Sequence, residues 1–131
     1  MGSSVRLMDM AAIFDSNIII DALNSHRPAL DAIKSLGGGS TTMSRISWIE
    51  ILAGAKPDHR AATEAYLRGC NIIELTPDIA ARAVEITRAG RLKLGDAIIW
   101  STASISGRTL ITRDSRDFPP DWPGVHRPYQ I

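Results

Sequence analysis

Five acidic residues occupy positions where a carboxylate is unusual, and together they could support metal-dependent chemistry. Asp15 follows a short apolar run, Glu50 lies among large apolar residues, and Asp96 precedes another apolar run. Asp114 and Asp117 follow the short segment TLIT. Two carboxylates about 4 Å apart repel each other by roughly 4 kcal/mol at an effective dielectric of about 20. A divalent cation bound through oxygen atoms would offset that repulsion, so the cluster predicts a site for Mg²⁺ or Mn²⁺.

Each of these acids also has a purely structural interpretation. Asp15 and Asp96 could cap the N-termini of helices, and Glu50 could extend its carboxylate to solvent. Ion pairs within the chain could also account for three of the acids: Glu50 with Arg45, Asp114 with Arg113, and Asp117 with Arg116. We favour a shared site because the five acids are all expected at one edge of the same sheet.

The elements that must position these acids alternate between strands and helices. We expect strands at 11–14, 40–44, 71–75 and 109–112, helices within 18–23, 26–39, 45–55, 57–70, 77–90 and 96–106, and an extended edge segment at 125–131. Such alternation is typical of a parallel sheet that helices cover on both faces. Ligands of open parallel sheets bind beyond the carboxyl ends of the strands, where Asp15, Asp114 and Asp117 are expected.

Composition restricts the protein class. The chain has 131 residues, 44% of them hydrophobic, which suits a single domain at 11–131 after a flexible extension at 1–10. A net charge of +1 gives no overall positive field for nucleic acid. The lone Cys70 excludes an intrachain disulfide and fits a cytoplasmic location. No apolar stretch reaches about 18 residues, so no membrane span is expected.

Four stretches of the sequence resemble the PIN-domain family, and within it the VapC-type toxins of bacterial toxin–antitoxin pairs. The stretches are IFDSNIIIDAL, SRISWIEILAGA, LKLGDAIIWSTA and LITRDSRDF. None of the four is specific alone, but their order and spacing cover about residues 12–127. The extension at 1–10 is longer than such toxins usually carry.

The resemblance implies a three-layer α/β/α fold with a mainly parallel sheet of four to five strands, and an Mg²⁺- or Mn²⁺-dependent endoribonuclease. Asp15, Glu50 and Asp96 match the first three acids of the family. Asp114 and Asp117 match a region in which family members differ in the acid that acts. Asp15, Asp96 and Asp114 would then be the metal ligands.

The resemblance also implies supporting residues and partners. Asn17 matches a polar residue that holds the first acid, and Thr112 matches a hydroxyl often found beside the last acid. The partners are RNA, a small VapB-like antitoxin and a second copy of the chain. A homodimer also agrees with the apolar character of 45–55 and 97–106.

The expected antitoxin contact combines charge with apolar packing. An arginine of the antitoxin would pair with the acids, and apolar anchors would lie in a groove between the helices at 18–36 and 45–69. The observation behind this groove is an apparent surplus of apolar side chains: Ile18, Ile19, Ile20, Leu52 and Leu67.

The basic residues near the acids could bind the phosphates of RNA. A phosphodiester is anionic, and a bound cation would reverse the repulsion from the carboxylates. Four basic side chains flank the acidic motifs and could hold neighbouring phosphates, or could simply be solvated at the surface: Arg91, Lys93, Arg113 and Arg116.

Other protein classes fit less well. A dehalogenase-like phosphatase would need a second Asp two residues after Asp15, where Asn17 stands. A receiver-like domain would need a lysine at the end of a strand, whereas Lys93 precedes a helix. A catalytically weak PIN-like module that only binds RNA would be expected to lack one of the core acids, and none is lacking.

Overall fold

The computed structural model of the protein describes residues 11–114, 118 and 124–130. The predicted extension at 1–10 and two predicted site residues, Arg116 and Asp117, lie outside the described residues. The elements, in chain order, are β1 (Ala12–Phe14), α1 (Ser16–Leu23), α2 (Arg27–Leu36), β2 (Thr42–Ser44), α3 (Arg45–Gly54), the 3₁₀ turn η3 (Pro57–His59), α4 (Arg60–Arg68), β3 (Asn71–Ile73), α5 (Pro77–Arg88), α6 (Leu94–Ser106), β4 (Thr109–Ile111) and β5 (Val125–His126).

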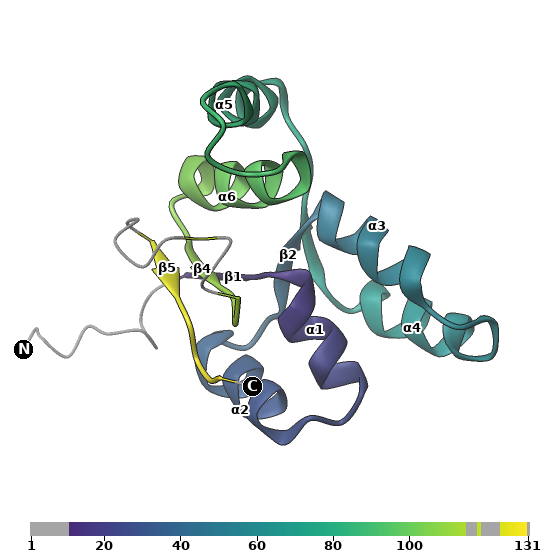
Figure 1. Ribbon diagram of the computed structural model, residues 1–131. Helices are drawn as coiled ribbons and strands as arrows, with labels where there is room; N and C mark the ends of the chain where they lie inside the picture. Colours follow the sequence, from purple (N-terminus) through teal and green to yellow (C-terminus); the bar gives the residue numbers. More distant parts are fainter. Residues whose placement is uncertain (1–10, 115–117, 119–123, 131) are drawn as a thin grey trace, which may run out of the picture.

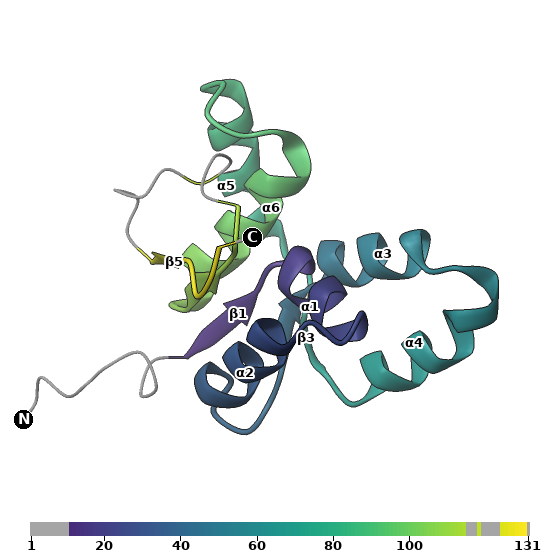
Figure 2. The ribbon, with the colours of Figure 1, turned by 60° about the horizontal axis from the view of Figure 1, so that its bottom comes forward.

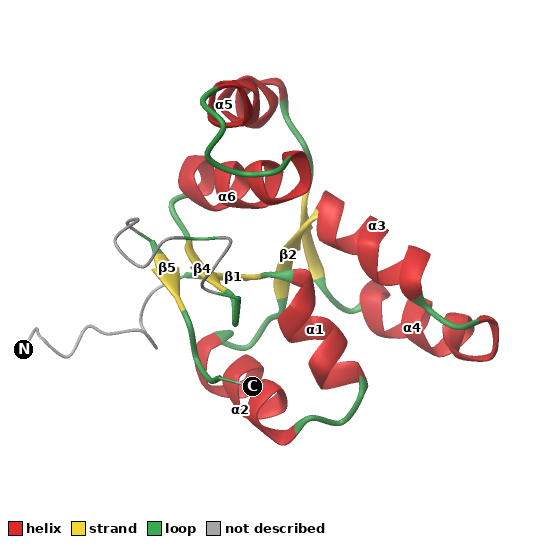
Figure 3. Ribbon diagram, in the orientation of Figure 1, coloured by secondary structure: helices red, strands yellow, loops and turns green. Residues whose placement is uncertain are grey.

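The described strands pair in parallel and form two ladders. One ladder has the order β1-β4-β5, and the other joins β2 to β3. β1 and β2 contact each other, so the two ladders lie side by side (Figure 3). The predicted parallel arrangement is confirmed, although the ladders do not merge into one sheet. Each strand has only two or three residues, which leaves few main-chain groups for a continuous ladder.

Helices cover both faces of the strands. α5 and α6 are stacked over one face, while α1 and α2 lie against the other (Figure 1). α3 and α4 pack together and extend beyond the strands (Figure 2). This arrangement confirms the three-layer α/β/α fold. Within the described residues, no helix is long and apolar enough to span a membrane.

Side-chain caps fix where several helices begin. The Asp15 side chain accepts a hydrogen bond from the Ser16 amide at the start of α1, and Ser44 and Thr76 cap α3 and α5 in the same way. Each cap satisfies a main-chain N–H that has no partner within its helix. Gly107 ends α6 with a positive φ of 70°, a conformation that glycine adopts without steric cost.

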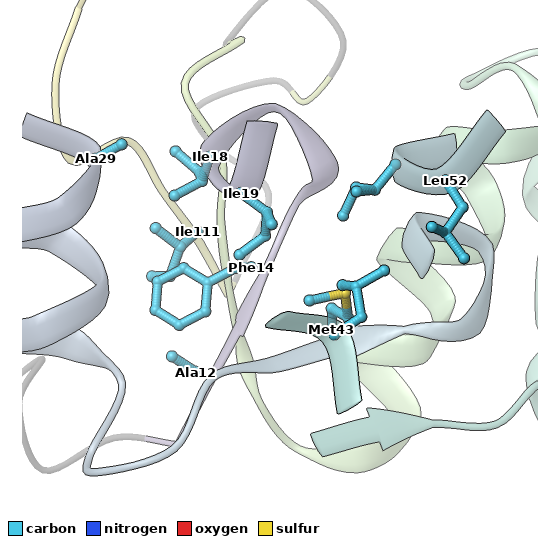
Figure 4. Close-up of a cluster of buried hydrophobic side chains, with 10 residues drawn as sticks. Ala12, Phe14, Ile18, Ile19, Ala29, Met43, Leu52 and Ile111 are labelled. Atoms are coloured by element: carbon cyan, nitrogen blue, oxygen red, sulfur yellow. The ribbon is translucent and has the colours of Figure 1, made fainter. Parts of the chain in front are cut away.

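The core consists of two clusters, one on each side of β1. Phe14 packs with residues of α1 and α2, whereas Ile13 packs with residues of α5 and α6. This division follows from the alternation of side chains along a strand. Figure 4 shows the first cluster, in which Ile18 and Ile111 lie beside the ring of Phe14.

One expectation about apolar side chains needs correction. Ile18, Ile19, Leu52 and Leu67 all belong to the first core cluster, so they are not a surplus available to a partner. Ile20 is 39% exposed and is the one member of that set that lies at the surface. The apolar run at 18–20 does not show which isoleucine is exposed. Successive isoleucines point in different directions around the helix, and only the packing of α1 decides which direction faces solvent.

α3 packs against both core clusters, with Ile46 against the second and Ile51 and Leu52 in the first, but it is not covered all round. Ile49 is 47% exposed and Glu50 is also exposed. Since α3 extends beyond the strands, its neighbours within the chain cover only part of its surface.

Candidate active site

Strand register brings Asp15 opposite Thr112. Phe14 aligns with Ile111 in the β1–β4 ladder, and the Asp15 amide donates to the Ile111 carbonyl oxygen at 2.9 Å. The Thr112 hydroxyl then donates to Oδ2 of Asp15 at 2.8 Å. The Asp15 carboxylate is thus buried, with an exposed fraction of 5% for the residue, at the carboxyl ends of two adjacent strands.

Asn17 joins the same network from the first turn of α1. Its Nδ2 donates to Oδ2 of Asp15 at 3.4 Å and to Oγ1 of Thr112 at 3.3 Å. Its Oδ1 accepts from the Arg113 amide at 3.4 Å. Asn17 therefore restrains both the carboxylate and the segment that follows β4.

Ser16 connects Asp15 to Glu50. The Ser16 hydroxyl lies 2.8 Å from Oε1 of Glu50 and 3.3 Å from Oδ1 of Asp15. The start of α6 is close by, because a Cβ atom on Gly95 would lie 3.5 Å from Oε2 of Glu50. Three segments that are far apart in sequence thus meet around Glu50.

The environment of Asp15 disfavours its negative charge. Burial raises the pKa of Asp15 to about 6, and the charge of Glu50 contributes to the rise. Hydrogen bonds from Thr112 and Ser16 act in the opposite direction. A cation beside this carboxylate would favour its ionised form.

The other predicted acids lie around this pair without forming a preassembled cluster. Asp96 is half-buried in the first turn of α6, directly after Gly95. Asp114 is half-buried two residues after Thr112, and its amide donates to the Thr112 hydroxyl at 3.3 Å. Among the described residues, no three Asp, Glu, His or Cys side chains form a group that could already hold a metal ion.

The structure decides which of these acids have the capping and pairing roles that the sequence allows. Asp15 does cap a helix, whereas Lys93, not Asp96, occupies the cap position of α6. Glu50 is not the acid paired with Arg45, because the Arg45 guanidinium binds Glu74, with Nε at 2.8 Å from Oε1. A capping role does not exclude a chemical role for Asp15, since the cap uses only Oδ1 of the carboxylate.

The basic residues differ in how they are held within the chain. Arg91 and Lys93 are exposed ahead of α6. Arg113 is engaged with α1, because its Nε lies 2.6 Å from Oδ2 of Asp21. The hydrogen bond to Asp21 raises the pKa of Arg113, and the charge of Asp114, the partner that the sequence suggested, adds to the rise.

Sequence reasoning missed three residues of this region. In the sequence, Ser16 is recognisable only as a residue typical of helix starts, beside Asp15. Asp21 lies on the same helix as Asn17, but nothing in the sequence relates it to Arg113. The Tyr129 hydroxyl also donates to Asp21, at 2.8 Å. Burial raises the pKa of Tyr129, and this hydrogen bond raises it further. Sequence patterns cannot reveal this contact, because Tyr129 and Asp21 are far apart along the chain.

Comparisons with known proteins give a consistent family. The PIN domain profile matches residues 12–119. No curated protein matches the chain significantly.

Solved structures agree with that profile. A chain of a toxin–antitoxin complex from Klebsiella pneumoniae is 40% identical with a TM-score of 0.84, and the match covers 92% of this chain and 100% of that one. A chain of VapBC2 from Rickettsia felis bound to promoter DNA is 20% identical with a TM-score of 0.71, covering 88% and 96%. A chain of FitAcB from Neisseria gonorrhoeae is 19% identical with a TM-score of 0.73, covering 92% and 99%. The two less similar structures support the fold alone, but the profile spans most of the sequence, and the chain belongs to the PIN-domain family.

Proposed function

We propose that the protein is a VapC-like toxin, a cytoplasmic endoribonuclease that hydrolyses RNA phosphodiester bonds and is restrained by a small VapB-like antitoxin. The observation that carries this proposal is the network that joins Asp15, Thr112, Ser16 and Glu50 at the carboxyl ends of the strands. Family membership and the 40% identical relative from a toxin–antitoxin complex support it.

The donor groups around Asp15 fit Mg²⁺ or Mn²⁺. They are oxygen atoms, which both cations prefer, and a buried carboxylate beside Glu50 would gain from a positive charge. In this proposal Asp15, Asp96 and Asp114 hold the cation. When bound, a divalent cation polarises a phosphoryl oxygen and lowers the pKa of water.

The chain's own residues would set the geometry of the reaction. Thr112 and Asn17 hold Oδ2 of Asp15 in place from two sides. Glu50 is exposed, accepts from Ser16 through Oε1, and could take a proton from water at Oε2. Asp117, outside the described residues, stays an alternative to Asp114 as the fourth acid.

Arg91 and Lys93 are the proposed contacts to RNA phosphates. Both side chains are exposed directly before the helix that carries Asp96. Cationic contacts at this position would position the RNA backbone without reading its bases. Arg113 can contribute only if it leaves Asp21, and Arg116 stays a prediction outside the described residues.

A groove between α1 and α3 suits the antitoxin. A cavity of about 440 Å³ is lined by residues of α1, α3, η3 and α4, among them Ile20, Leu23 and Ile51. Ile20 and Leu23 are both exposed. Most of the apolar residues that the sequence suggested as antitoxin contacts lie in the core instead. We propose that apolar side chains of an antitoxin segment fill this groove while an arginine of the same segment pairs with Glu50 and Asp15.

Expression in cells tests this function. The wild-type chain should arrest growth, Asp96→Asn should not, and coexpression with the neighbouring small reading frame should relieve the arrest. Asp31→Asn changes an exposed acid on α2 and serves as the matched control, which should arrest growth like the wild type. Arrest by Asp96→Asn would contradict the site. RNA binding without cleavage by purified wild-type protein would indicate a PIN-like binding module instead.

A further inference from the structure

The segment after β4 is attached to α1 at several points. The Thr112 hydroxyl reaches Asp15, and the Arg113 amide reaches Asn17. The Asp114 amide donates to the Thr112 hydroxyl at 3.3 Å. Arg113 therefore separates two residues of the proposed site, and the position of its main chain determines where both can lie.

The side chain of Arg113 provides a further attachment point. Its Nε lies 2.6 Å from Oδ2 of Asp21, and its Nη2 lies 3.5 Å from Oδ1. The Asp21 side chain is only 14% exposed, so solvent weakens this pair less than a surface ion pair. A guanidinium held by both oxygens of a carboxylate is restricted in orientation as well as in distance.

Tyr129 completes the arrangement from the C-terminal segment. Its hydroxyl donates to Oδ2 of Asp21 at 2.8 Å. The centroid of its ring lies 5.2 Å from the ring centroid of His26, which precedes α2. Asp21 thus receives hydrogen bonds from two segments that are distant in sequence. A carboxylate used in this way is held in one orientation and can in turn hold Arg113.

We propose that Asp21 is a positioning residue, which acts through Arg113 to place Thr112 and Asp114 beside Asp15. This inference rests on the proposed nuclease function, because it assigns Asp21 an effect on the same site. The proposal gives Asp21 no part in the chemistry itself, because its carboxylate binds Arg113 and Tyr129 rather than any residue of the Asp15 network.

Cleavage kinetics of Asp21→Asn on a synthetic RNA test the functional part. We expect kcat to fall by about ten- to a hundredfold, because small displacements of catalytic groups have effects of that order. The KM should rise by no more than about twofold, since Asp21 is not proposed to contact RNA and a released Arg113 could only strengthen RNA binding. Glu74→Gln, which removes the Arg45–Glu74 ion pair, is the matched control and should leave both constants unchanged.

A double-mutant cycle tests whether Asp21 acts through Arg113. Arg113→Gln should lower kcat like Asp21→Asn, and the double variant should be no slower than the slower single variant. Independent, multiplicative losses in the double variant would overturn the proposal. An unchanged kcat in folded Asp21→Asn would overturn it as well and leave Asp21 with a role in stability alone.

Amide hydrogen exchange measured by NMR gives a readout that does not require activity. In Asp21→Asn, the amides of Arg113 and Asp114 should exchange at least about tenfold faster, because the side chain of Arg113 no longer restrains this segment. The Asn71 amide, which is bonded to the Thr41 carbonyl oxygen, should be unaffected. Equal acceleration at all three amides would indicate general destabilisation and contradict positioning. If the wild type does not cleave RNA, the proposed function fails while this measurement still tests the geometry.

Discussion

At the scale of single residues, Asp15 combines two demands that oppose each other. It caps α1, which favours a carboxylate, and it is buried, which disfavours the charge of that carboxylate. Thr112, Ser16 and Asn17 offset part of this cost with hydrogen bonds. An acid that is kept in such a place is a candidate for function, because a purely structural cap needs no burial.

The pKa of Asp15 predicts how stability depends on pH in the absence of metal. The folded state raises the pKa from 3.8 to about 6, so folding favours the protonated form. The resulting stability is fully present below about pH 4 and is lost as the pH rises through about 6. The difference corresponds to about 3 kcal/mol.

Urea unfolding in EDTA at pH 4 and pH 7 measures this effect. The change to Asp15→Asn should reduce the loss of stability between these pH values by about 2.5 kcal/mol, because the titrating group is gone. Asp31→Asn replaces an exposed acid and should keep the wild-type dependence. An identical pH dependence in wild type and Asp15→Asn would show that the burial of Asp15 does not control its ionisation.

The sequence predicts the single residues of the site unevenly. Asp15 and Asp114 follow strands, and Asp96 precedes an apolar helix, so a strand–helix pattern is enough to propose them. The sequence did not identify Ser16 and Asp21 as site residues, because their roles depend on contacts with Glu50 and Arg113, which are distant in sequence. Such contacts are set by how α1 packs against α3 and β4, which no local pattern encodes.

At the scale of elements, local signals predict most of the chain. The strand–helix order follows from alternating apolar runs, and the helix predicted to begin at Pro77 does begin there. The segment at 57–70 begins with the separate turn η3, which a single helical pattern conceals. The absence of a continuous ladder between β1 and β2 is likewise invisible in sequence, because it depends on how the two strands meet in space.

The cap of α5 gives a prediction at this scale. The Thr76 hydroxyl accepts from the Ile79 amide at 3.2 Å, so Thr76→Ala should lower the free energy of unfolding by about 1 kcal/mol. Thr76→Ser keeps the acceptor and should lose only a small part of that stability. Thermal or urea unfolding of the two variants makes the comparison. Equal stability of Thr76→Ala and the wild type would contradict the capping role.

At the scale of the whole molecule, α3 and α6 each keep large apolar side chains exposed. Ile49 and Ile105 are 47% and 49% exposed, and these are the helices whose apolar sequences led us to expect a homodimer. We propose that a second copy of the chain covers these side chains, separately from the groove proposed for the antitoxin. Burial of such side chains stabilises an association through the hydrophobic effect.

Light scattering at micromolar concentration tests the homodimer. The wild type should have twice the mass of one chain, and Ile49→Glu combined with Ile105→Glu should shift the protein to one chain, because charge would be placed in an apolar contact. Leu30→Glu introduces the same charge at an exposed position on α2 and should stay dimeric. A wild-type protein with the mass of a single chain would contradict the proposal.

The central claim is that the acids around Asp15 form a metal-dependent ribonuclease site, and cleavage of a synthetic RNA by purified protein tests it most directly. Wild-type protein should cleave in Mg²⁺ or Mn²⁺, stop in EDTA, and resume when excess cation is restored. Asp15→Asn and Asp96→Asn should be inactive although folded, whereas Asp31→Asn should cleave like the wild type. Undiminished cleavage in excess EDTA, or by folded Asp96→Asn, would contradict the account.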